Sequence, residues 1–185
     1  MLVAIKEKDK VVLGISICDS SVDMNDKDLS LAENIPMWKV DGEKDCYVAT
    51  PELAHEGDIF RYNSYIFRGI TDGQSIIEKV LPKMKDVLIK NDLMLNDKEW
   101  DSQLLIIKGD KVFKISNFFC VSESEGYEVV HNNNLIVGAL AETVGKDPVD
   151  RILSAIRFAN RMMNRQYFPL TIFDSKTKRK KVYYK

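Results

Sequence analysis

Short apolar runs occur in pairs along this chain, and a turn-forming segment separates the two runs of each pair. The pairs cover residues 2–5 and 11–17, 36–40 and 45–49, 103–107 and 112–115, 127–130 and 135–137, and 170–173 and 181–184. The separating segments contain charged residues, glycine or asparagine, which are typical of the turns of β-hairpins. Consecutive hairpins form antiparallel sheets, so this pattern argues against a parallel doubly wound sheet.

Two longer segments have the apolar periodicity of helices instead. Residues 72–90 carry an apolar stripe with Thr71 as the expected N-cap, and Pro82 inside the stripe is expected to kink or split the helix. Residues 148–164 carry a stronger stripe, with Asp147 in the capping position and Pro148 at the first helical position. The order of strands, helix, strands, helix and strands predicts an α+β fold of packed layers.

Length and charge limit the class of protein further. With 185 residues, 45% of them hydrophobic and 30% charged, the chain is expected to form a single globular domain over residues 1–185. Lysine and arginine number 27 against 28 aspartates and glutamates, so the net charge of -1 gives no overall attraction to nucleic acid or acidic membranes. The two histidines lie far apart in sequence and no cysteine pair has metal-binding spacing, so we expect no metal ion and no cofactor.

The cysteines and the first residues indicate a compartment. Cys18, Cys46 and Cys120 form an odd set without a CxxC pair, which favours reduced thiols, as in the cytosol. The first ten residues lack the pattern of a signal peptide, and no apolar run approaches the roughly 18 residues of a membrane helix. The sequence therefore predicts a soluble cytoplasmic protein with no membrane partner.

Four segments of the chain, in this order, resemble proteasome β-type subunits and the bacterial proteasome-like peptidase. They are the opening strand with its charged turn and Val-Val-Leu-Gly sequence (residues 11–14), residues 37–40, residues 104–110 and residues 135–138. The resemblance covers most of the chain and implies an N-terminal-nucleophile hydrolase fold, a four-layer αββα sandwich of two antiparallel sheets between helices. It also implies assembly into rings, hence a homo-oligomer, and by analogy an ATPase or peptide partner.

The catalytic residues of that family map only partly onto this sequence. The family's nucleophile is a threonine at the first position of the mature chain, whose hydroxyl attacks the peptide carbonyl. Met1 lies at or just beyond that position without a hydroxyl or thiol, and processing to Leu2 would not supply one. Lys39 matches the family's lysine, whereas the family's aspartate falls on Ser16 by strict spacing, with Asp19 close behind.

A second family motif also fails, and together these differences suggest a function. The family's Gly-Ser-Gly turn before a helix aligns with residues 138–140, which read Gly-Ala-Leu and lack the hydroxyl. The expected function is therefore a non-catalytic, proteasome-like structural or interaction protein that self-associates. One alternative is an active peptidase or amidohydrolase of the same superfamily, with Ser16 or Cys18 as an atypical nucleophile and Lys39 as helper. A free cysteine on an apolar strand is more often a core residue.

The other alternative is a small nucleic-acid-binding module. The basic run 176–181, followed by Tyr183 and Tyr184, has the cations and aromatic rings that bind phosphates and stack on bases. The same lysines also suit a charged hairpin tip that keeps an edge strand from pairing. Because the whole chain is close to neutral, we favour the hairpin tip and expect no nucleic-acid partner.

Overall fold

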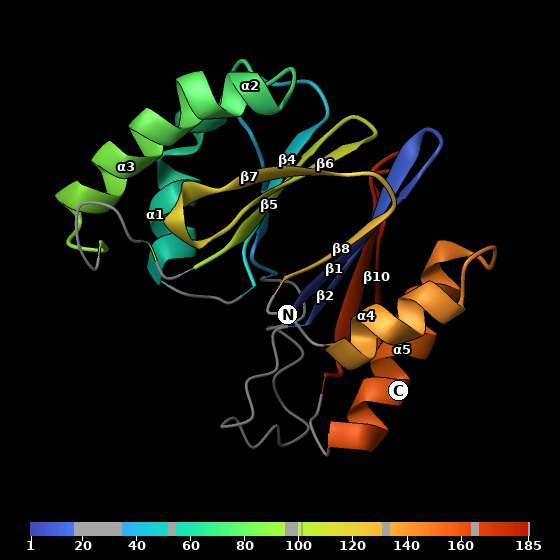
Figure 1. Ribbon diagram of the computed structural model, residues 1–185. Coiled ribbons are helices and arrows are strands. Elements are labelled where there is room, and N and C mark those ends of the chain that lie inside the picture. Colours follow the sequence, from blue (N-terminus) through green and yellow to red (C-terminus); the bar gives the residue numbers. More distant parts are fainter. Residues whose placement is uncertain are drawn as a thin grey trace.

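A computed structural model (Figure 1) describes residues 1–16, 35–51, 55–94, 100, 102–130, 134–163 and 167–184. Its strands form two five-stranded antiparallel sheets. The first sheet has the strand order β10-β9-β2-β1-β8. Its strands are β1 (Leu2–Glu7), β2 (Lys10–Ser16), β8 (Tyr127–Val130), β9 (Leu170–Asp174) and β10 (Lys180–Tyr183).

The second sheet has the strand order β3-β4-β5-β6-β7. Its strands are β3 (Met37–Lys39), β4 (Cys46–Ala49), β5 (Leu104–Lys108), β6 (Lys111–Ile115) and β7 (Val121–Ser124). The predicted hairpins β1–β2, β3–β4, β5–β6 and β9–β10 are all confirmed as antiparallel pairs. Strand β7 was not predicted, and it adds to β6 at the edge of this sheet.

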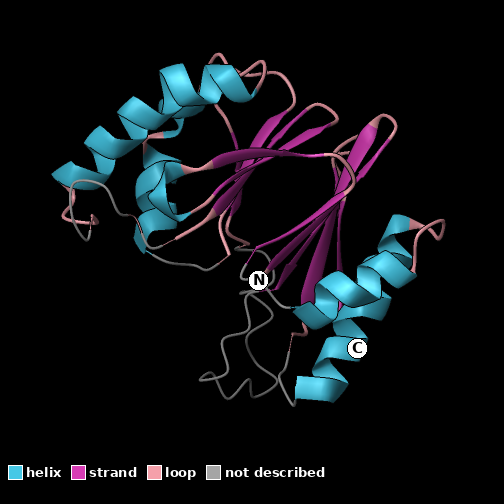
Figure 2. Ribbon diagram, in the orientation of Figure 1, coloured by secondary structure: helices cyan, strands magenta, loops and turns pink. Residues whose placement is uncertain are grey.

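Helices cover the outer face of each sheet, so that the molecule has four layers (Figure 2). The second sheet is covered by α1 (His55–Tyr62), α2 (Gly73–Ser75) and α3 (Leu81–Lys90), with shorter helical turns at Ser64–Phe67 and Ile76–Val80. The first sheet is covered by α4 (Asn134–Glu142) and α5 (Pro148–Met163). The predicted α+β sandwich of two antiparallel sheets between helices is therefore confirmed. None of the described helices is long and apolar enough to cross a membrane.

The alternation of side chains along each strand divides the core into three layers. Along β2, Val12 faces the cluster beneath α4 and α5, whereas Val11 and Leu13 face the other sheet. The layer between the sheets contains an aromatic contact, in which the rings of Tyr47 and Phe173 lie 4.9 Å apart. Both faces of each sheet are thus buried, which explains why runs such as residues 104–107 are apolar throughout.

The prediction of a strand at 135–137 is wrong, because these residues lie in α4. Strand β8 pairs instead with β1, with Val130 opposite Leu2. The local sequence Leu-Ile-Val favours a strand, but Ile136 and Leu140 are one helical turn apart and fully buried against α5 and the first sheet. Residues 138–140 therefore lie inside α4, so their comparison with the family's Gly-Ser-Gly turn is also wrong. The residues that precede α4, 131–133, lie outside the described residues.

The helical segment from residue 72 also differs in detail from its prediction. Asp72, rather than Thr71, is the N-cap, and its carboxylate accepts a hydrogen bond of 2.7 Å from the Ser75 nitrogen. The segment Ile76–Val80 has π-type hydrogen bonds, and the α-helix begins at Leu81. The hydrogen-bonding pattern thus changes just before Pro82, which has no N–H to donate, as the prediction of a split helix required.

Candidate functional site

Three strand ends from both sheets meet at the start of β1. The Met1 nitrogen donates hydrogen bonds of 2.9 Å to the carbonyl oxygens of Ser16 and Pro51. Ser16 is the last residue of β2, whereas Pro51 follows β4 in the other sheet, so this nitrogen connects the two sheets. The Ser16 nitrogen in turn donates to the Met1 carbonyl at 3.0 Å. We refer to Met1, Ser16, Thr50 and Pro51 as the strand-end site.

Two hydroxyl groups belong to the strand-end site. Ser16 is 1% exposed, and its Oγ has no hydrogen-bond partner among the described residues. Thr50 is 4% exposed, and its nitrogen donates to the Pro36 carbonyl at 2.9 Å. A serine becomes a nucleophile when a neighbouring base accepts its proton and the substrate reaches its oxygen. Within the described part of the chain, Ser16 has no hydrogen-bonded base, and its burial keeps substrate away.

Met1 and the first four residues of β1 have apolar side chains. Leu2, Val3, Ala4 and Ile5 are all fully buried apolar residues. Met1 packs against the apolar cluster that underlies α4 and α5. None of these five side chains has a hydroxyl, a thiol or an amine, so none can form an acyl intermediate.

Lys39 lies on β3 but away from the strand-end site. It is exposed and stands opposite Tyr47 in the β3–β4 ladder. Pro51 lies four residues beyond Tyr47, which corresponds to roughly 13 Å along a strand. Met37, two residues nearer to that end of β3, is buried in the layer between the sheets. The structure therefore brings Ser16 to Met1 but does not bring Lys39 there, and Asp19 and Cys18 lie outside the described residues.

The electrostatic neighbour of Lys39 is Asp45, at the turn end of the same hairpin. The Asp45 carboxylate lies 2.6 Å from Nζ of Lys178. This hydrogen bond holds the pKa of Asp45 below its ordinary value, and the charges of Lys178, Lys44 and Lys39 add smaller contributions in the same direction. Lys39 thus helps to keep Asp45 ionised in a surface cluster, at the opposite end of the hairpin from Met1.

The basic run 176–181 is partly neutralised in the fold. Lys176 forms an ion pair with Asp9, in the β1–β2 turn, and Lys178 forms the ion pair with Asp45. Each pair connects the β9–β10 turn to another hairpin turn. Among the described residues, no group of three or more histidine, cysteine, aspartate or glutamate side chains is arranged to hold a metal ion.

Thr50 and Pro51 were not identified as site residues from the sequence. The Thr-Pro pair indicates only that a strand ends there, since proline has no N–H for the ladder. The contact of Pro51 with Met1 joins residues 50 positions apart and on different sheets. No local pattern in the sequence carries that information.

Comparisons with known proteins show which solved structures are similar to this architecture. No protein-family model and no curated protein sequence matches the chain. Among solved structures, BPH from Thiobacillus denitrificans in complex with epoxomicin is similar, with a TM-score of 0.71 and 15% identity, covering 94% of this chain and 96% of that one. Anbu (ancestral beta-subunit) from Yersinia bercovieri is similar with a TM-score of 0.65 and 12% identity, covering 100% of this chain and 87% of that one.

A eukaryotic member of the group has the same arrangement. HslV from Trypanosoma brucei is similar with a TM-score of 0.60 and 10% identity, covering 94% of this chain and 97% of that one. These neighbours are proteasome-like peptidases, and each likeness extends over most of both chains. The chain therefore has the proteasome-like, N-terminal-nucleophile hydrolase fold, as the resemblance in its sequence predicted.

Proposed function

We propose that this chain is a non-catalytic proteasome-like protein that self-associates and acts as a structural or interaction component. The observation that carries the proposal is that Met1 and the first four residues of β1, Leu2 to Ile5, have no hydroxyl, thiol or amine side chain in a fold of this type. Binding a peptide without a nucleophile leaves most of the barrier to hydrolysis in place. The distance of Lys39 from the strand-end site further supports this reading.

Covalent labelling tests the absence of catalysis. The purified protein is incubated with epoxomicin, the ligand of the similar Thiobacillus protein, and analysed by intact mass spectrometry. We expect the 21.2 kDa mass to stay unchanged and fluorogenic peptides to remain uncleaved. An adduct would contradict the proposal, as would peptide cleavage that is lost in a Ser16→Ala variant.

One observation favours an active enzyme as the second candidate. The Ser16 hydroxyl is a buried polar group without a partner among the described residues, on a residue whose backbone carbonyl accepts from the Met1 nitrogen. Unsatisfied polar groups are often found at functional sites. In this alternative, Ser16 is the atypical nucleophile of a peptidase or amidohydrolase. Its exposure of 1% argues against this role, because an acyl carbon has to approach the oxygen directly.

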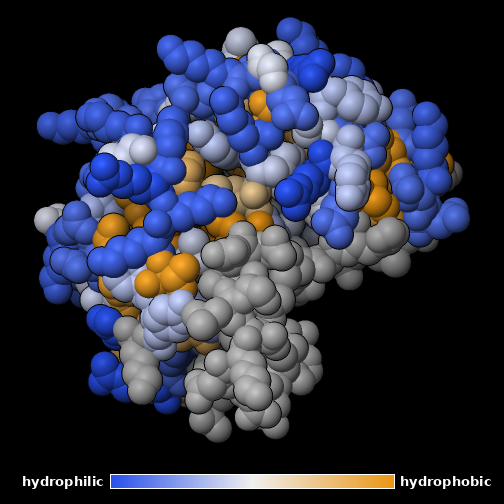
Figure 3. All heavy atoms as spheres, turned by 180° about the vertical axis from the view of Figure 1, so that it is seen from behind, coloured by the Kyte–Doolittle hydropathy of each residue, from blue (hydrophilic) through white to orange (hydrophobic). Residues whose placement is uncertain are grey.

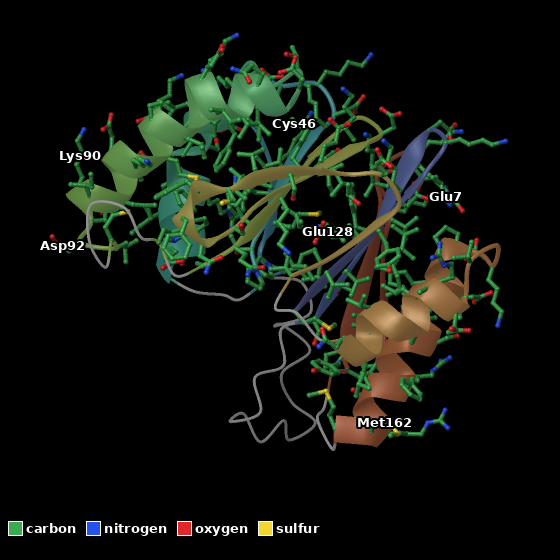
Figure 4. All side chains as sticks on the ribbon, viewed as in Figure 1. Glu7, Cys46, Lys90, Asp92, Glu128 and Met162 are labelled. Carbon is green, nitrogen blue, oxygen red and sulfur yellow. The ribbon has the colours of Figure 1, made fainter. Side chains whose placement is uncertain are left out.

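The outer side of α5 supports self-association. Phe158 is 43% exposed and Met162 is 62% exposed, and they are one helical turn apart on the same face of the helix. Met162 projects from the end of α5 in Figure 4. Figure 3 shows that apolar patches also interrupt the mostly hydrophilic surface on the reverse side of the molecule. Exposed neighbouring apolar side chains favour an interface with another protein surface, here a second copy.

Light scattering after size exclusion tests self-association. We expect a particle larger than 21.2 kDa at micromolar protein concentration. The double variant Phe158→Glu/Met162→Glu is expected to shift it towards the monomer. Ile89→Glu on α3 is the matched control, because Ile89 is a comparably exposed apolar residue (53%) in the other helix layer. A wild-type monomer would contradict the proposal.

We also propose that residues 1–185 form one domain that acts in the cytoplasm. Cys46 and Cys120 are free thiols, one buried and one exposed, which suits a reducing compartment. An ATPase or peptide partner is proposed by analogy with the fold. Affinity purification of the tagged protein from its own cytosol tests for this partner. It also tests the location, because recovery of the protein only in an oxidised, disulfide-linked form would count against the cytoplasm.

A further inference from the structure

The edge strand β10 directs some of its backbone N–H and C=O groups to the outside of its sheet. The Asp174 nitrogen donates to the Arg179 carbonyl at 3.1 Å, which makes residues 174 and 179 a hydrogen-bonded pair. Such pairs alternate along an antiparallel ladder. Lys180 and Val182 therefore direct their N–H and C=O groups away from β9. No described residue forms a backbone hydrogen bond with these outward groups.

The exposed lysines of β10 have no acidic partner in the described part of the chain. Lys176 and Lys178, in the adjoining turn, each pair with an aspartate. Lys180 and Lys181 are also exposed, but no described acidic side chain forms an ion pair with either of them. Burial lowers the pKa of Lys180, and the nearby positive charge of Arg61 on α1 lowers it further. An anion at this edge would relieve that repulsion.

We propose that β10 is a docking edge for an extended acidic segment of another protein, which adds to the first sheet as a further strand. The outward backbone groups of Lys180 and Val182 would pair with the segment's main chain. Its acidic side chains would lie beside Lys180 and Lys181, because successive side chains project to opposite faces of the sheet. This inference goes beyond the proposed function and does not depend on it.

A second copy of this chain does not fit this edge. If β10 paired with another β10 with Lys180 opposite Val182, Lys181 of one strand would lie opposite Lys181 of the other, and like charges directly opposite are destabilising. Lysines on an edge strand are a common device against such self-pairing. An acidic strand would be attracted to these lysines rather than repelled. The same lysines therefore favour an acidic partner over a second copy of β10.

A single-stranded nucleic acid fits the edge less well than a peptide strand. The side chain of Tyr183 packs against the cluster beneath α4 and α5, and Nζ of Lys181 lies 4.9 Å from its ring centroid. That ring is therefore not available as a stacking platform for bases. The alternating N–H and C=O groups of an edge strand match another strand, whereas a phosphate backbone has only acceptors.

The test uses the full-length protein and short labelled probes. An end-blocked, fluorescein-labelled hexapeptide of alternating glutamate and valine is titrated with the protein, and its fluorescence anisotropy is followed. A hexapeptide of alternating lysine and valine and an oligothymidine of similar length are titrated in parallel. We expect saturable binding of the acidic peptide alone. Stronger binding of the oligothymidine would overturn the proposal in favour of a nucleic-acid surface.

Methylated peptides separate strand pairing from simple charge attraction without altering the protein. Methylation of alternate backbone nitrogens in the acidic peptide removes N–H donors while the net charge stays the same. In one of the two possible methylation registers, we expect affinity to fall by about tenfold, as for the loss of a hydrogen bond or two. Equal affinity for the unmethylated peptide and both methylated peptides would overturn strand addition.

Variants of β10 test whether the peptide binds at this edge. Val182→Pro removes an outward N–H, and it leaves the ladder with β9 intact because that N–H does not point towards β9. We expect about tenfold weaker peptide binding for this variant, and unchanged binding for the control Val182→Thr. The double variant Lys180→Glu/Lys181→Glu should abolish binding. Circular dichroism confirms folding of each variant, and wild-type affinity in a folded Val182→Pro protein would overturn the proposal.

Discussion

Lys114 on β6 and Glu128 on β8 form an ion pair that joins the two sheets, with 3.0 Å between Nζ and Oε1. Both side chains are largely buried, at 14% and 21% exposure, and Lys114 Nζ also donates to the Val129 carbonyl at 3.3 Å. Glu128, labelled in Figure 4, lies at the margin of the apolar layer between the sheets. The positive charge of Lys114 and the negative charge of Glu128 therefore compensate each other.

Removing one partner of this pair is expected to destabilise the fold. Lys114→Met leaves the Glu128 carboxylate partly buried without its cation, and we expect the free energy of unfolding to fall by about 1–3 kcal/mol. The double variant Lys114→Met/Glu128→Met should recover part of this loss, because two apolar side chains then replace the pair. Urea unfolding followed by circular dichroism measures all three proteins.

Lys111 on the same strand provides the control for this prediction. Its contact with Glu123 is 4.0 Å long, and both side chains are more than a third exposed. Lys111→Met should therefore change stability by less than about 0.5 kcal/mol. An effect of Lys114→Met no larger than that of Lys111→Met would show that the pair between the sheets contributes nothing.

The hairpins were predictable because their information is local. In β2, alternate apolar residues and an adjacent turn specify both the strand and its pairing with β1. Strand β7 was missed because Ser122 and Glu123 are polar, and only its position beside β6 makes it a strand. Helix α4 was misread because the burial of Ile136 and Leu140 against α5, rather than local propensity, determines its conformation.

Helix α5 packs so closely on β2 that a side chain at position 14 would force its neighbours to shift. A Cβ atom added to Gly14 would lie 2.7 Å from Cγ2 of Ile152, well inside van der Waals contact. Ile152 belongs to the buried cluster beneath α5 and Gly14 is also buried, and atoms in such an interior yield little. Gly14→Ala is therefore expected to lower the free energy of unfolding by about 1–3 kcal/mol, as overpacking does. Thermal unfolding of the variant measures the effect.

The identity of the clashing atom makes this prediction specific. Ile152→Ala removes Cγ2 but leaves a cavity, which costs about 2–5 kcal/mol by itself. In the double variant Gly14→Ala/Ile152→Ala, the new methyl group occupies part of that space. The double variant should therefore lose less stability than the two single variants lose together. Gly126→Ala, which has open space around its Cβ position, is the steric control. Simple additivity would contradict the packing described.

The candidate site was less predictable than the fold. The sequence identified Met1 and Ser16 as equivalents of family positions, and the structure places them in direct contact. It also identified Lys39 as the family's lysine, but a match in a short motif does not specify the register of β3 against β4. Met37 and Lys39 share a face of β3, but only Met37 is buried in the layer between the sheets, whereas Lys39, nearer the turn, is exposed. Side-chain positions set by pairing between distant strands require the three-dimensional structure.

Two cysteines of known environment should differ sharply in reactivity. Cys46 on β4 is fully buried, and burial raises the pKa of its thiol to about 12. Because the thiolate is the reactive form, we expect Cys46 to resist iodoacetamide at pH 8 in the folded protein. Cys120 is exposed and should be alkylated under the same conditions. Peptide mapping by mass spectrometry distinguishes the two, and labelling of Cys46 before unfolding would contradict its position in the core.

The carboxylate of Glu43 should make stability depend on pH. A hydrogen bond from Lys108 holds the pKa of Glu43 below its ordinary value of 4.5, and a second hydrogen bond, 2.7 Å long, from the Gly69 nitrogen adds to this effect. The folded state therefore binds this proton more weakly than the unfolded state does. The contribution to stability is complete above pH 4.5 or so and is lost as the pH falls through the lowered value.

A comparison of wild type with Glu43→Gln measures this contribution. Because the two side chains are 18% and 23% exposed, we expect the variant to be less stable by about 1 kcal/mol at pH 7. The difference should shrink steadily below pH 4.5, since protonation removes the same charge from the wild type that the substitution removes from the variant. Glu123→Gln is the control, as its carboxylate lies 4.0 Å from Lys111 on the surface. A difference that stays constant from pH 7 to pH 3 would mean that Glu43 acts through its shape rather than its charge.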